Sequence, residues 1–412
     1  MYLTAIDLGS SRIKALIGEL KKDGSLVIVK AIKKSSSGIK KGEIVYPEET
    51  VKSLFEVLSE VRHFDARCIK NLIFSVSGSR SKIILSKSTL VIPHSDFEII
   101  QEDVDRVIKD STAVNIPPGW EIIHSFPREF IIDDIEVDGT NVVGLSGKKL
   151  EANVVLIAVF SSISKNSKKV AELVAGKKGG FDGTLYFAPL ASERAVLSRK
   201  QRDLGVVLVD MGFDTTGIVV YQDGRLVTAK VLPVGSGNIS NDIALGLKCS
   251  VASAEKLKLT LGCAAARDVS TKDRIEMGDF EEGRSGQVSK KFVAEIIESR
   301  VREIFELINS ELKMVGLAGK LPAGAVITGG GSKLRGMVDI AREELRIDAK
   351  IGMPNIEECE LSNAQLAQLV DDPDMSVAFG LLLSRADVFK KNSEFVSGGS
   401  WVSRFLRTLW AS

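Results

Sequence analysis

Two stretches of the chain follow one pattern, and this repeated pattern decides the fold. Residues 5–27 read AIDLGSSRIKALIGELKKDGSLV, and residues 207–227 read VLVDMGFDTTGIVVYQDGRLV. In each stretch an apolar strand ends in Asp, a turn with Gly and Ser or Thr follows, and a second apolar strand leads through Asp-Gly into a third. Asp-Gly between apolar runs is a strong hairpin signal. The repeat predicts two similar lobes, each with a hairpin loop directed at a shared site.

Composition narrows the class of protein. The 412 residues are enough for two or three domains. Lys and Arg total 55 and Asp and Glu total 54, and this net charge of +1 argues against a generally basic nucleic-acid binder. Four cysteines without a CxxC pair, together with three histidines, indicate reduced thiols in a cytosolic protein rather than a zinc or disulfide framework. The sequence shows neither a signal peptide nor an apolar run long enough to span a bilayer.

The rest of the chain alternates helical and strand patterns, which favours the α/β class. Apolar residues at helical spacing predict helices at 47–61 and 289–315. Residues 83–161 have the pattern of a compact insertion, with a helix near 102–111 between predicted strands. Residues 390–400, KKNSEFVSGGS, are polar and rich in Gly and Ser, which is typical of a flexible linker.

The first repeated loop has the residues of a phosphate-binding turn. Gly9 permits a tight turn, and backbone N–H groups with the hydroxyls of Ser10 and Ser11 can surround phosphate oxygens. Lys14 supplies a positive charge, and Asp7 suits a Mg²⁺ ion held through water. By itself this pattern is equally consistent with an ordinary hairpin turn.

Three further features repeat or extend this chemistry. In the second loop Asp210 would face the same centre as Asp7, from the opposite lobe. A later apolar strand leads into three consecutive glycines, which let the backbone lie flat against a ligand or else form a plain turn. Glu255 and Lys258 lie three residues apart on a predicted helix, where they could reach a ribose and a base or form a solvated ion pair.

The order of these motifs resembles the actin-like ATPase superfamily and, within it, the FtsA family of bacterial cell-division proteins. The similarity extends over nearly the whole chain. It includes SGIKKGEIVYPEETVKSL at 37–54, VVGLSGKKLEANV at 142–154 and LPVGSGNISNDIALGL at 232–247. The resemblance implies an α/β, two-lobed actin-like (ribonuclease H-like) ATPase fold, with an inserted α/β subdomain in the first lobe and a C-terminal amphipathic helix.

The resemblance also implies a division of the chain. The first lobe takes residues 1–82, 162–190 and 363–388, and residues 83–161 form the inserted subdomain, with polymer and partner contacts. The second lobe has an inner subdomain at 191–238 and 301–362 and an outer one, for base and partner peptide, at 239–300. A linker at 389–399 and an amphipathic membrane-targeting helix at 400–412 complete it.

ATP and Mg²⁺ are the ligands that the resemblance implies. Asp7 and Asp210 would act at the catalytic centre and hold the metal through water. Relatives often orient the attacking water with a Glu or Gln that this chain lacks, and Glu193 is the candidate substitute for it. The nucleotide contacts would come from Gly9, Ser10, Ser11, Lys14, Gly212, Thr215, Thr216, Glu255, Lys258, Gly329, Gly330, Gly331 and Ser332.

Two departures from the family pattern bear on turnover. Relatives often have glycines where this chain has Phe213 and Asp214, and their loss limits how closely backbone can approach a phosphate. Polymerising relatives often carry Glu or Gln near Ala188, whose methyl group cannot orient a water molecule. The sequence therefore predicts ATP binding with at most slow hydrolysis.

The end of the chain has the pattern of an interfacial helix. On a helix, apolar and basic side chains would separate onto two faces, as in peripheral membrane anchors. The alternative is a helix that docks on the protein's own core or on a partner. The predicted lipid-contacting residues are Trp401, Val402, Arg404, Phe405, Leu406, Arg407, Leu409 and Trp410.

The leading hypothesis is a polymer-forming scaffold that tethers the division protein FtsZ to the inner face of the cytoplasmic membrane at the division site. The resemblance implies contacts with the FtsZ C-terminal peptide, with further copies of this chain, with lipid and with other membrane proteins of the divisome. Lys290 and Arg300 are the candidate residues for the peptide. The alternatives are a pilus-assembly actin homologue that binds the tail of a membrane protein, and a small-molecule kinase.

Overall fold

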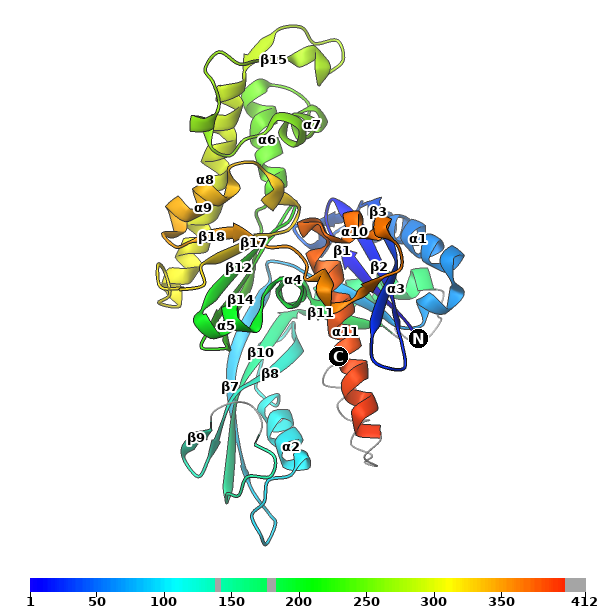
Figure 1. The fold of residues 1–412 in the computed structure, drawn as a ribbon, viewed down its shortest axis with the longest axis vertical. Coiled ribbons are helices and arrows are strands. Elements are labelled where there is room, and N and C mark those ends of the chain that lie inside the picture. The colour runs from blue at the N-terminus through cyan, green and yellow to red at the C-terminus, as the bar shows by residue number, and fades with distance from the viewer. Residues whose placement is uncertain (138–141, 176–182, 397–412) are drawn as a thin grey trace.

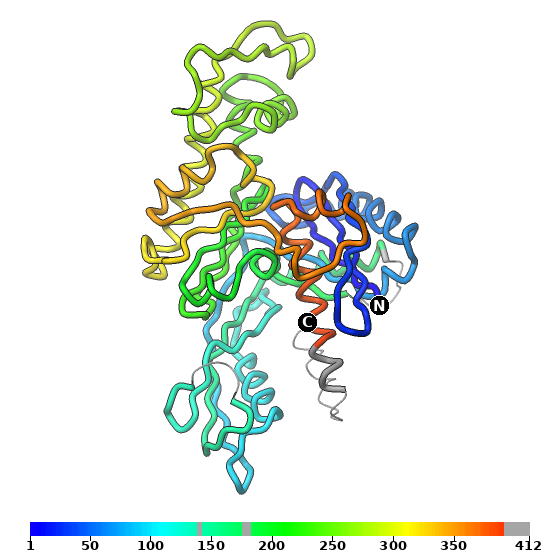
Figure 2. Tube along the Cα trace, in the orientation of Figure 1, coloured from blue at the N-terminus to red at the C-terminus, as the bar shows by residue number. Residues whose placement is uncertain are grey.

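The computed structural model describes residues 1–137, 142–175 and 183–396, with side chains as far as Lys390. Figure 1 shows two lobes side by side and a third, elongated unit that extends from them. The blue and orange-red ends of the chain lie together in one lobe, as Figure 2 shows. The predicted helix at 400–412 lies outside the described residues. Among the helices that are described, none is both long and apolar enough to cross a bilayer.

The first lobe is built on a six-stranded sheet with the order β11-β6-β1-β2-β3-β19. β1 (Tyr2–Leu8), β2 (Arg12–Leu20) and β3 (Leu26–Ser35) form the predicted antiparallel meander. β6 (Leu72–Val76) and β11 (Thr184–Phe187) add in parallel on one side, and β19 (Glu360–Leu361) on the other.

Helices cover both faces of this sheet. Ile6 and Leu8 of β1 pack with α1 (Pro47–Phe64) and α3 (Ser161–Ala175), because successive strand residues point to opposite faces. Leu3 and Ala5 face α4 (Ala188–Val196), α10 (Ala364–Val370) and α11 (Ser376–Val396). This double burial explains why β1 is apolar at almost every position.

The second lobe repeats the arrangement in a five-stranded sheet of order β14-β13-β12-β17-β18. β12 (Val206–Met211), β13 (Thr216–Gln222) and β14 (Arg225–Leu232) again form a meander, and β17 (Ala325–Thr328) again pairs in parallel with its first strand. β18 (Ala349–Ile351) completes the sheet. The Asp223-Gly224 turn has positive φ at both residues, as a two-residue hairpin requires. The prediction of two similar lobes is confirmed.

Helices of the second lobe extend beyond its sheet. α8 (Lys290–Met314) begins where the Ser289 hydroxyl accepts a hydrogen bond from the Phe292 N–H, and it runs from the outer subdomain down to the sheet beside α9 (Met337–Leu345). The outer subdomain holds α6 (Ser236–Leu247), α7 (Val251–Leu261) and the hairpin of β15 (Arg274–Glu276) and β16 (Gln287–Ser289).

The inserted subdomain has its own sheet, of order β7-β10-β8-β9, with one helix against it. It comprises β7 (Ser81–Val91), α2 (Gln101–Ser111), β8 (Trp120–Ile132), β9 (Ile135–Val137) and β10 (Lys149–Phe160). The chain leaves the first lobe after β6 and returns to it at α3 (Figure 1). The remaining elements are β4 (Ile39–Lys40), β5 (Glu43–Ile44), α5 (Arg199–Leu204) and the 3₁₀ turns η1 (Ala66–Ile69), η2 (Ala266–Asp268), η3 (Met277–Asp279), η4 (Gly330–Lys333), η5 (Ile356–Glu358) and η6 (Pro373–Met375).

The predicted linker at 389–399 is wrong over most of its length. α11 continues to Val396, so residues 389–396 are helical, and only 397–399 lie outside the described residues. The physical reason is that this stretch contains no helix breaker before Gly398, while Phe389 still packs against the first-lobe core. The helix therefore extends at least eight residues further than the composition suggested.

A buried histidine joins the inserted subdomain to the first lobe. His124 of β8 accepts a hydrogen bond at Nε2 from the backbone N–H of Phe187, at 2.9 Å, and its ring contacts Tyr186 edge-on. Burial lowers the pKa of His124 to about 3, so the ring is neutral at physiological pH. Phe187 directly precedes α4, so this bond fixes the start of a helix that borders both lobes.

Replacing this histidine is expected to remove a specific pH dependence of stability. The unfolded chain takes up a proton at His124 as pH falls below about 6.5, whereas the folded chain does so only near pH 3, so the wild type loses stability over this range. At pH 7.5 we expect His124→Gln to lower the free energy of unfolding by about 2 kcal/mol, through lost packing and an imperfect hydrogen bond. The difference should shrink by about 2 kcal/mol at pH 5. Urea unfolding at both pH values measures it.

The exposed His63 on α1 provides the matched control for this test. His63→Gln should match the wild type within about 0.5 kcal/mol at both pH values, because replacing an exposed side chain usually changes stability little. A difference between His124→Gln and wild type that stays constant from pH 7.5 to pH 5 would contradict the assignment.

Candidate functional site

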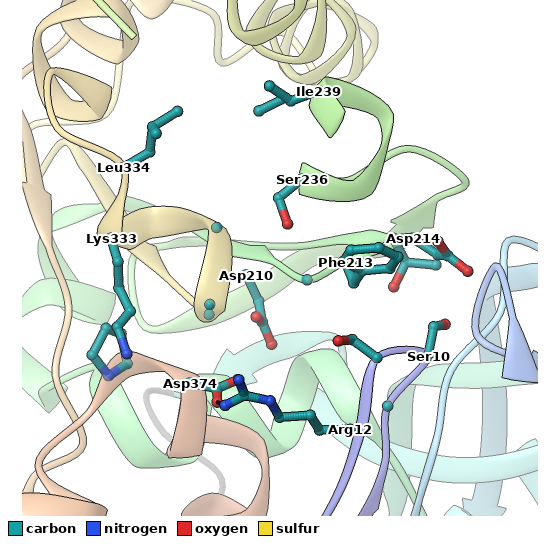
Figure 3. A pocket seen from close by; sticks show the side chains of 18 of the residues that line it. Ser10, Arg12, Asp210, Phe213, Asp214, Ser236, Ile239, Lys333, Leu334 and Asp374 are labelled. Atoms are coloured by element: carbon teal, nitrogen blue, oxygen red, sulfur yellow. Dashed lines mark ion pairs between the residues drawn. The ribbon is translucent and has the colours of Figure 1, made fainter. Parts of the chain in front are cut away.

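A cavity of about 590 Å³ lies between the two lobes and is lined from both of them. Figure 3 shows its side chains converging from the β1–β2 turn, the β12–β13 turn, the η4 loop and the start of α6. Of the predicted site residues, the cavity wall includes Asp7, Gly9, Ser10, Ser11, Lys14, Asp210, Gly212, Thr215, Glu255, Lys258, Gly329, Gly330, Gly331 and Lys290.

The first loop holds its carboxylate by strand pairing and a hydroxyl bridge. Ser75 of β6 donates to Asp7 Oδ1 at 3.0 Å and accepts from the Leu8 N–H at 2.7 Å. The parallel pairing of β1 with β6 therefore fixes the direction of Asp7. A side chain at Gly9 would approach the Arg12 carbonyl oxygen within 2.6 Å, so this tight turn requires glycine.

Lys14 lies between two carboxylates. Its Nζ is 3.1 Å from Asp7 Oδ2 and 2.8 Å from Asp374 Oδ1, and the side chain is only 11% exposed. Burial alone would lower the pKa of Lys14, but the two carboxylates outweigh it and raise the pKa above the usual value. The cation that the sequence assigned to phosphate binding is thus already engaged, whereas Arg12 lines the cavity with 55% of its side chain exposed.

The second loop places Asp210 across the cavity from Asp7 (Figure 3 shows Asp210). Burial raises the pKa of Asp210 to about 6, hydrogen bonding with Ser192 opposes part of that rise, and the charge of Asp7 adds to it. The two carboxylates that the repeat predicted to share one centre therefore do influence each other.

The two residues that replace the family's glycines have defined contacts. The Phe213 ring fills the space that a side chain at Gly237 would need, 2.8 Å from that position, and Lys258 Nζ lies 5.6 Å from the ring centroid. Asp214 Oδ2 accepts a hydrogen bond of 3.1 Å from the backbone N–H of Lys41. Since Lys41 belongs to the β4–β5 turn of the first lobe, this bond joins the lobes at the edge of the cavity.

Helices α6 and α7 and the η4 loop form a further part of the second lobe's cavity wall. Lys258 Nζ contacts Glu255 at 2.8 Å and donates to the Ser236 carbonyl oxygen at 2.8 Å. Burial lowers the pKa of Lys258 against the opposing charge of Glu255. Gly329 has φ +83°, and a side chain there would collide with Asp210 and come within 2.7 Å of the Met211 carbonyl oxygen. The glycines thus let η4 pass close behind the second loop.

Several predicted site residues lie outside the cavity wall. Thr216 donates to the Val234 carbonyl oxygen within the β13–β14 region, and Ser332 donates to the Gly329 carbonyl oxygen, so both support the loops from behind. Glu193 lines a second cavity of about 600 Å³. There it pairs with Arg202 at 2.7 Å, and burial raises its pKa against that charge. The structure does not bring Glu193 to the site where it was expected to orient water.

The two predicted partner residues are separated as well. Lys290, at the first position of α8, faces the cavity between the lobes. Arg300, nearly three turns later on the same helix, forms two hydrogen bonds with Asp242 at 2.5 and 2.9 Å and contacts Glu303 at 2.6 Å. Only Arg300 therefore belongs to the outer subdomain surface on which a peptide was expected to bind.

Sequence reasoning missed residues that only the folded chain brings to the cavity. Asp374, Lys333 and Arg335 line it, although they lie more than 300 residues from the first loop. Nothing local distinguishes Asp374 within the acidic stretch DDPDM at 371–375. Arg12 could have been found, because it follows the two serines directly on the hairpin. Among the residues that the structure describes, no group of three or more His, Cys, Asp or Glu side chains could hold a metal directly.

Two lobes of the same topology, enclosing one cavity between two hairpin loops that each carry an Asp, define the actin-like class. The fold is similar to that of a chain in the structure described as "PilM-PilN type IV pilus biogenesis complex". The TM-score is 0.63 at 16% identity, over 93% of this chain and 98% of that chain. It is also similar to MreB5 of Spiroplasma citri solved with ADP and with AMPPNP, with TM-scores of 0.54 and 0.56 at 13% and 14% identity over 95% of this chain and 98% of each.

Sequence comparison assigns the family within that class. The family described as "Cell division protein FtsA" matches residues 207–380, and the "SHS2 domain inserted in FTSA" matches residues 78–158. The FtsA proteins of Pseudomonas aeruginosa and Escherichia coli K12 are each 30% identical, over 92% and 98% of this chain and 88% and 96% of theirs. That of Bacillus subtilis is 31% identical over 85% of this chain and 78% of its own. The chain belongs to the FtsA family of cell-division proteins.

The raised pKa of Asp210 predicts that its charge destabilises the unliganded fold. The cost is absent below about pH 4, where the carboxyl is protonated in both states, and complete above about pH 6. Without nucleotide and with a chelator present, the free energy of unfolding of Asp210→Asn at pH 7.5 should exceed that of the wild type by about 2 kcal/mol. The difference should fall below about 1 kcal/mol at pH 4.5 and vanish near pH 3, as followed by thermal or urea unfolding.

Asp203, which is 57% exposed, is a suitable control because the same substitution there removes an unburied charge. Asp203→Asn should change stability by less than about 0.5 kcal/mol. If Asp210→Asn were less stable than the wild type at pH 7.5, the inference that this carboxylate is held at a cost would be refuted.

Proposed function

We propose that this chain binds ATP with Mg²⁺ between its lobes, polymerises, and tethers the FtsZ ring to the inner face of the cytoplasmic membrane at the division site. In this role it recruits other membrane proteins of the divisome. The observation that carries the proposal is the 590 Å³ cavity between two Asp-bearing hairpin loops in a chain of the FtsA family.

The lining of the cavity supports a nucleotide as its ligand. The β1–β2 turn offers backbone N–H groups and the hydroxyls of Ser10 and Ser11, which suit phosphate oxygens. Glu255 and Lys258 supply a carboxylate and an ammonium at the far end, where ribose and base would lie. The similar fold of MreB5, solved with ADP and with AMPPNP, supports the same use of the cavity.

The donor set fits a hydrated metal ion better than a directly coordinated one. Asp7 and Asp210 face one another across the cavity, and Mg²⁺ commonly keeps several waters while two carboxylates and phosphates surround it. When bound, the ion would neutralise phosphate charge. These two side chains would hold its water shell, and the low exposure of Asp7 would keep that shell ordered.

The surroundings of the phosphate end support slow hydrolysis at most. Ala188 occupies the cavity wall where a hydrogen-bonding side chain would be needed to orient water. Glu193 is engaged with Arg202 in the other cavity. A binding switch that holds nucleotide for long periods suits a scaffold better than rapid turnover does.

Membrane attachment is proposed from the sequence of residues 400–412, which the structure does not describe. α11 carries the chain out of the first lobe as far as Val396, so the tail would follow after a few residues. One short amphipathic helix binds a bilayer weakly, and polymerised copies would bind tightly through their effective concentration. The inserted subdomain is the proposed site of contacts between copies.

The FtsZ C-terminal peptide is proposed to bind the outer subdomain near Arg300. An acidic peptide would have to compete with Asp242 for the Arg300 guanidinium, which argues for moderate affinity. Lys290 faces the cavity instead, and it would connect peptide binding with nucleotide occupancy if α8 shifts.

Binding of MgATP should stabilise the folded chain. At a concentration 100 times the dissociation constant the gain is about 2.7 kcal/mol, which corresponds to a rise in melting temperature of roughly 3 °C for a chain of this length. Gly330→Val places an aliphatic side chain in the cavity wall, 3.3 Å from Asp374 Oδ1 at its Cβ, without a positive φ. This variant should melt near the wild type without nucleotide and show no rise with MgATP. No rise in the wild type would refute nucleotide binding.

Sedimentation of FtsZ with vesicles tests the tether as a whole. With anionic phosphatidylglycerol-containing vesicles and MgATP, FtsZ should pellet only when the full chain is present. A truncation after Val396 keeps α11 intact and should leave both proteins in the supernatant. Arg300→Glu should keep its own vesicle binding and lose most FtsZ from the pellet. If the truncated chain pelleted as well as the full chain, the tail would not be the anchor.

A further inference from the structure

The segment that connects α10 to α11 in the first lobe forms part of the cavity wall. We name residues 372–374, Asp-Pro-Asp, the acidic tongue. Its last residue, Asp374, lies in the cavity wall close to Arg12, and both are labelled in Figure 3. None of the predicted roles for the nucleotide site included this segment.

Asp374 lies close to three cationic side chains near the β1–β2 turn, the part of the cavity where phosphate is proposed to bind. Its carboxylate lies 2.8 Å from Lys14 Nζ, 3.6 Å from Lys33 Nζ and 4.0 Å from the Arg12 guanidinium. Although burial opposes ionisation, the charge of Lys14 above all holds the pKa of Asp374 below its usual range. The side chain is 17% exposed, so these interactions are only partly screened by solvent.

The acidic tongue is held in this position by bonds that do not involve Asp374's own carboxylate. The Pro373 carbonyl oxygen accepts hydrogen bonds from the Gly329 N–H at 3.1 Å and from the Ser376 hydroxyl at 2.9 Å. The Asp374 N–H donates to Asp372 Oδ1 at 2.9 Å, and Asp372 in turn pairs with Lys333 at 2.7 Å. The carboxylate of Asp374 therefore stays beside the glycine loop, 3.3 Å from the position of a side chain at Gly330.

A phosphate group entering this end would meet an unusual balance of charge. Lys14 is shared by Asp7 and Asp374, and Asp210 lies across the cavity. Each further phosphate adds negative charge, so its interaction with a fixed carboxylate becomes less favourable with every step from mono- to triphosphate. Removing the carboxylate would both relieve this repulsion and release part of the charge of Lys14 and Arg12.

We propose that Asp374 is a specificity-determining residue of the nucleotide cavity: it competes with the terminal phosphate for Lys14 and Arg12, and so lowers the affinity for ATP relative to ADP. This rests on the proposed nucleotide binding. The acidic tongue leads directly into α11. Asp374 therefore lies both beside the proposed phosphate position and at the start of the helix that precedes the tail.

The test compares the dissociation constants of MgADP and MgATP for the full-length wild type and Asp374→Asn, by calorimetry or by competition with a fluorescent ADP analogue. Asn is nearly isosteric and leaves Lys14 paired with Asp7. We expect ATP to bind about tenfold more tightly to the variant and ADP about threefold more tightly, as for one partly screened charge within several ångströms. Both gains should shrink in 0.5 M salt.

Glu360→Gln is the matched control, because it removes one exposed carboxylate that pairs with Lys21 outside the cavity wall. Its affinities should stay within about twofold of the wild type. Melting curves report whether each variant is folded, and Asp374→Ser removes the same charge if the Asn variant is destabilised.

The outcomes separate this proposal from the function on which it rests. If the wild type binds both nucleotides and their affinity ratio is unchanged in Asp374→Asn and Asp374→Ser, nucleotide binding stands and the role of Asp374 is refuted. If the wild type binds ADP but ATP binds measurably only to the variants, the role of Asp374 is supported and ATP binding by the wild type is refuted. If no protein binds either nucleotide, the proposed function fails and this inference fails with it.

Discussion

The cavity depends on one buried ammonium group held between carboxylates from distant parts of the chain. Lys14 joins Asp7, on the strand before it, to Asp374, near the start of the last described helix. Each of these charges would be costly to bury alone, and together they satisfy one another in a region of low exposure. The first hairpin and the C-terminal segment of the first lobe are thus fixed to each other through the floor of the cavity.

The cavity also requires the η4 loop to pack closely against the second hairpin, and its glycines make this possible. At Gly329 the positive φ and the closeness of Asp210 exclude any side chain, which lets the η4 loop lie directly behind the second hairpin. The acidic tongue then bonds to this loop through the Pro373 carbonyl oxygen. The second lobe's strand β17 and the η4 loop are thus hydrogen-bonded to the segment that leads into the first lobe's helix α11.

In the second hairpin loop, Phe213 and Asp214 stand where relatives often have glycines, and both side chains make contacts at the cavity. Phe213 packs against Gly237, and Asp214 accepts a hydrogen bond from the Lys41 N–H of the opposite lobe. The loss of two glycines therefore gives up close approach of backbone to a ligand and adds a direct bond between the lobes. His124 has a comparable role for the inserted subdomain, since it bonds to the residue that precedes α4.

The two-lobed plan could be predicted from the sequence, because apolar strand patterns, Asp-Gly turns and the duplicated Asp-bearing loops are local signals along the chain. The sequence also determined which loops would face the cavity, from Gly9 and Ser10 in one lobe to Asp210 in the other. Three features became visible only in the folded chain: Lys14 pairs with Asp374, Glu193 lies in a different cavity, and the last described helix reaches Val396. These outcomes depend on charges and packing partners that only the folded chain brings together, as with Lys14 and Asp374, which are 360 residues apart in the sequence. No pattern along the chain records such a contact.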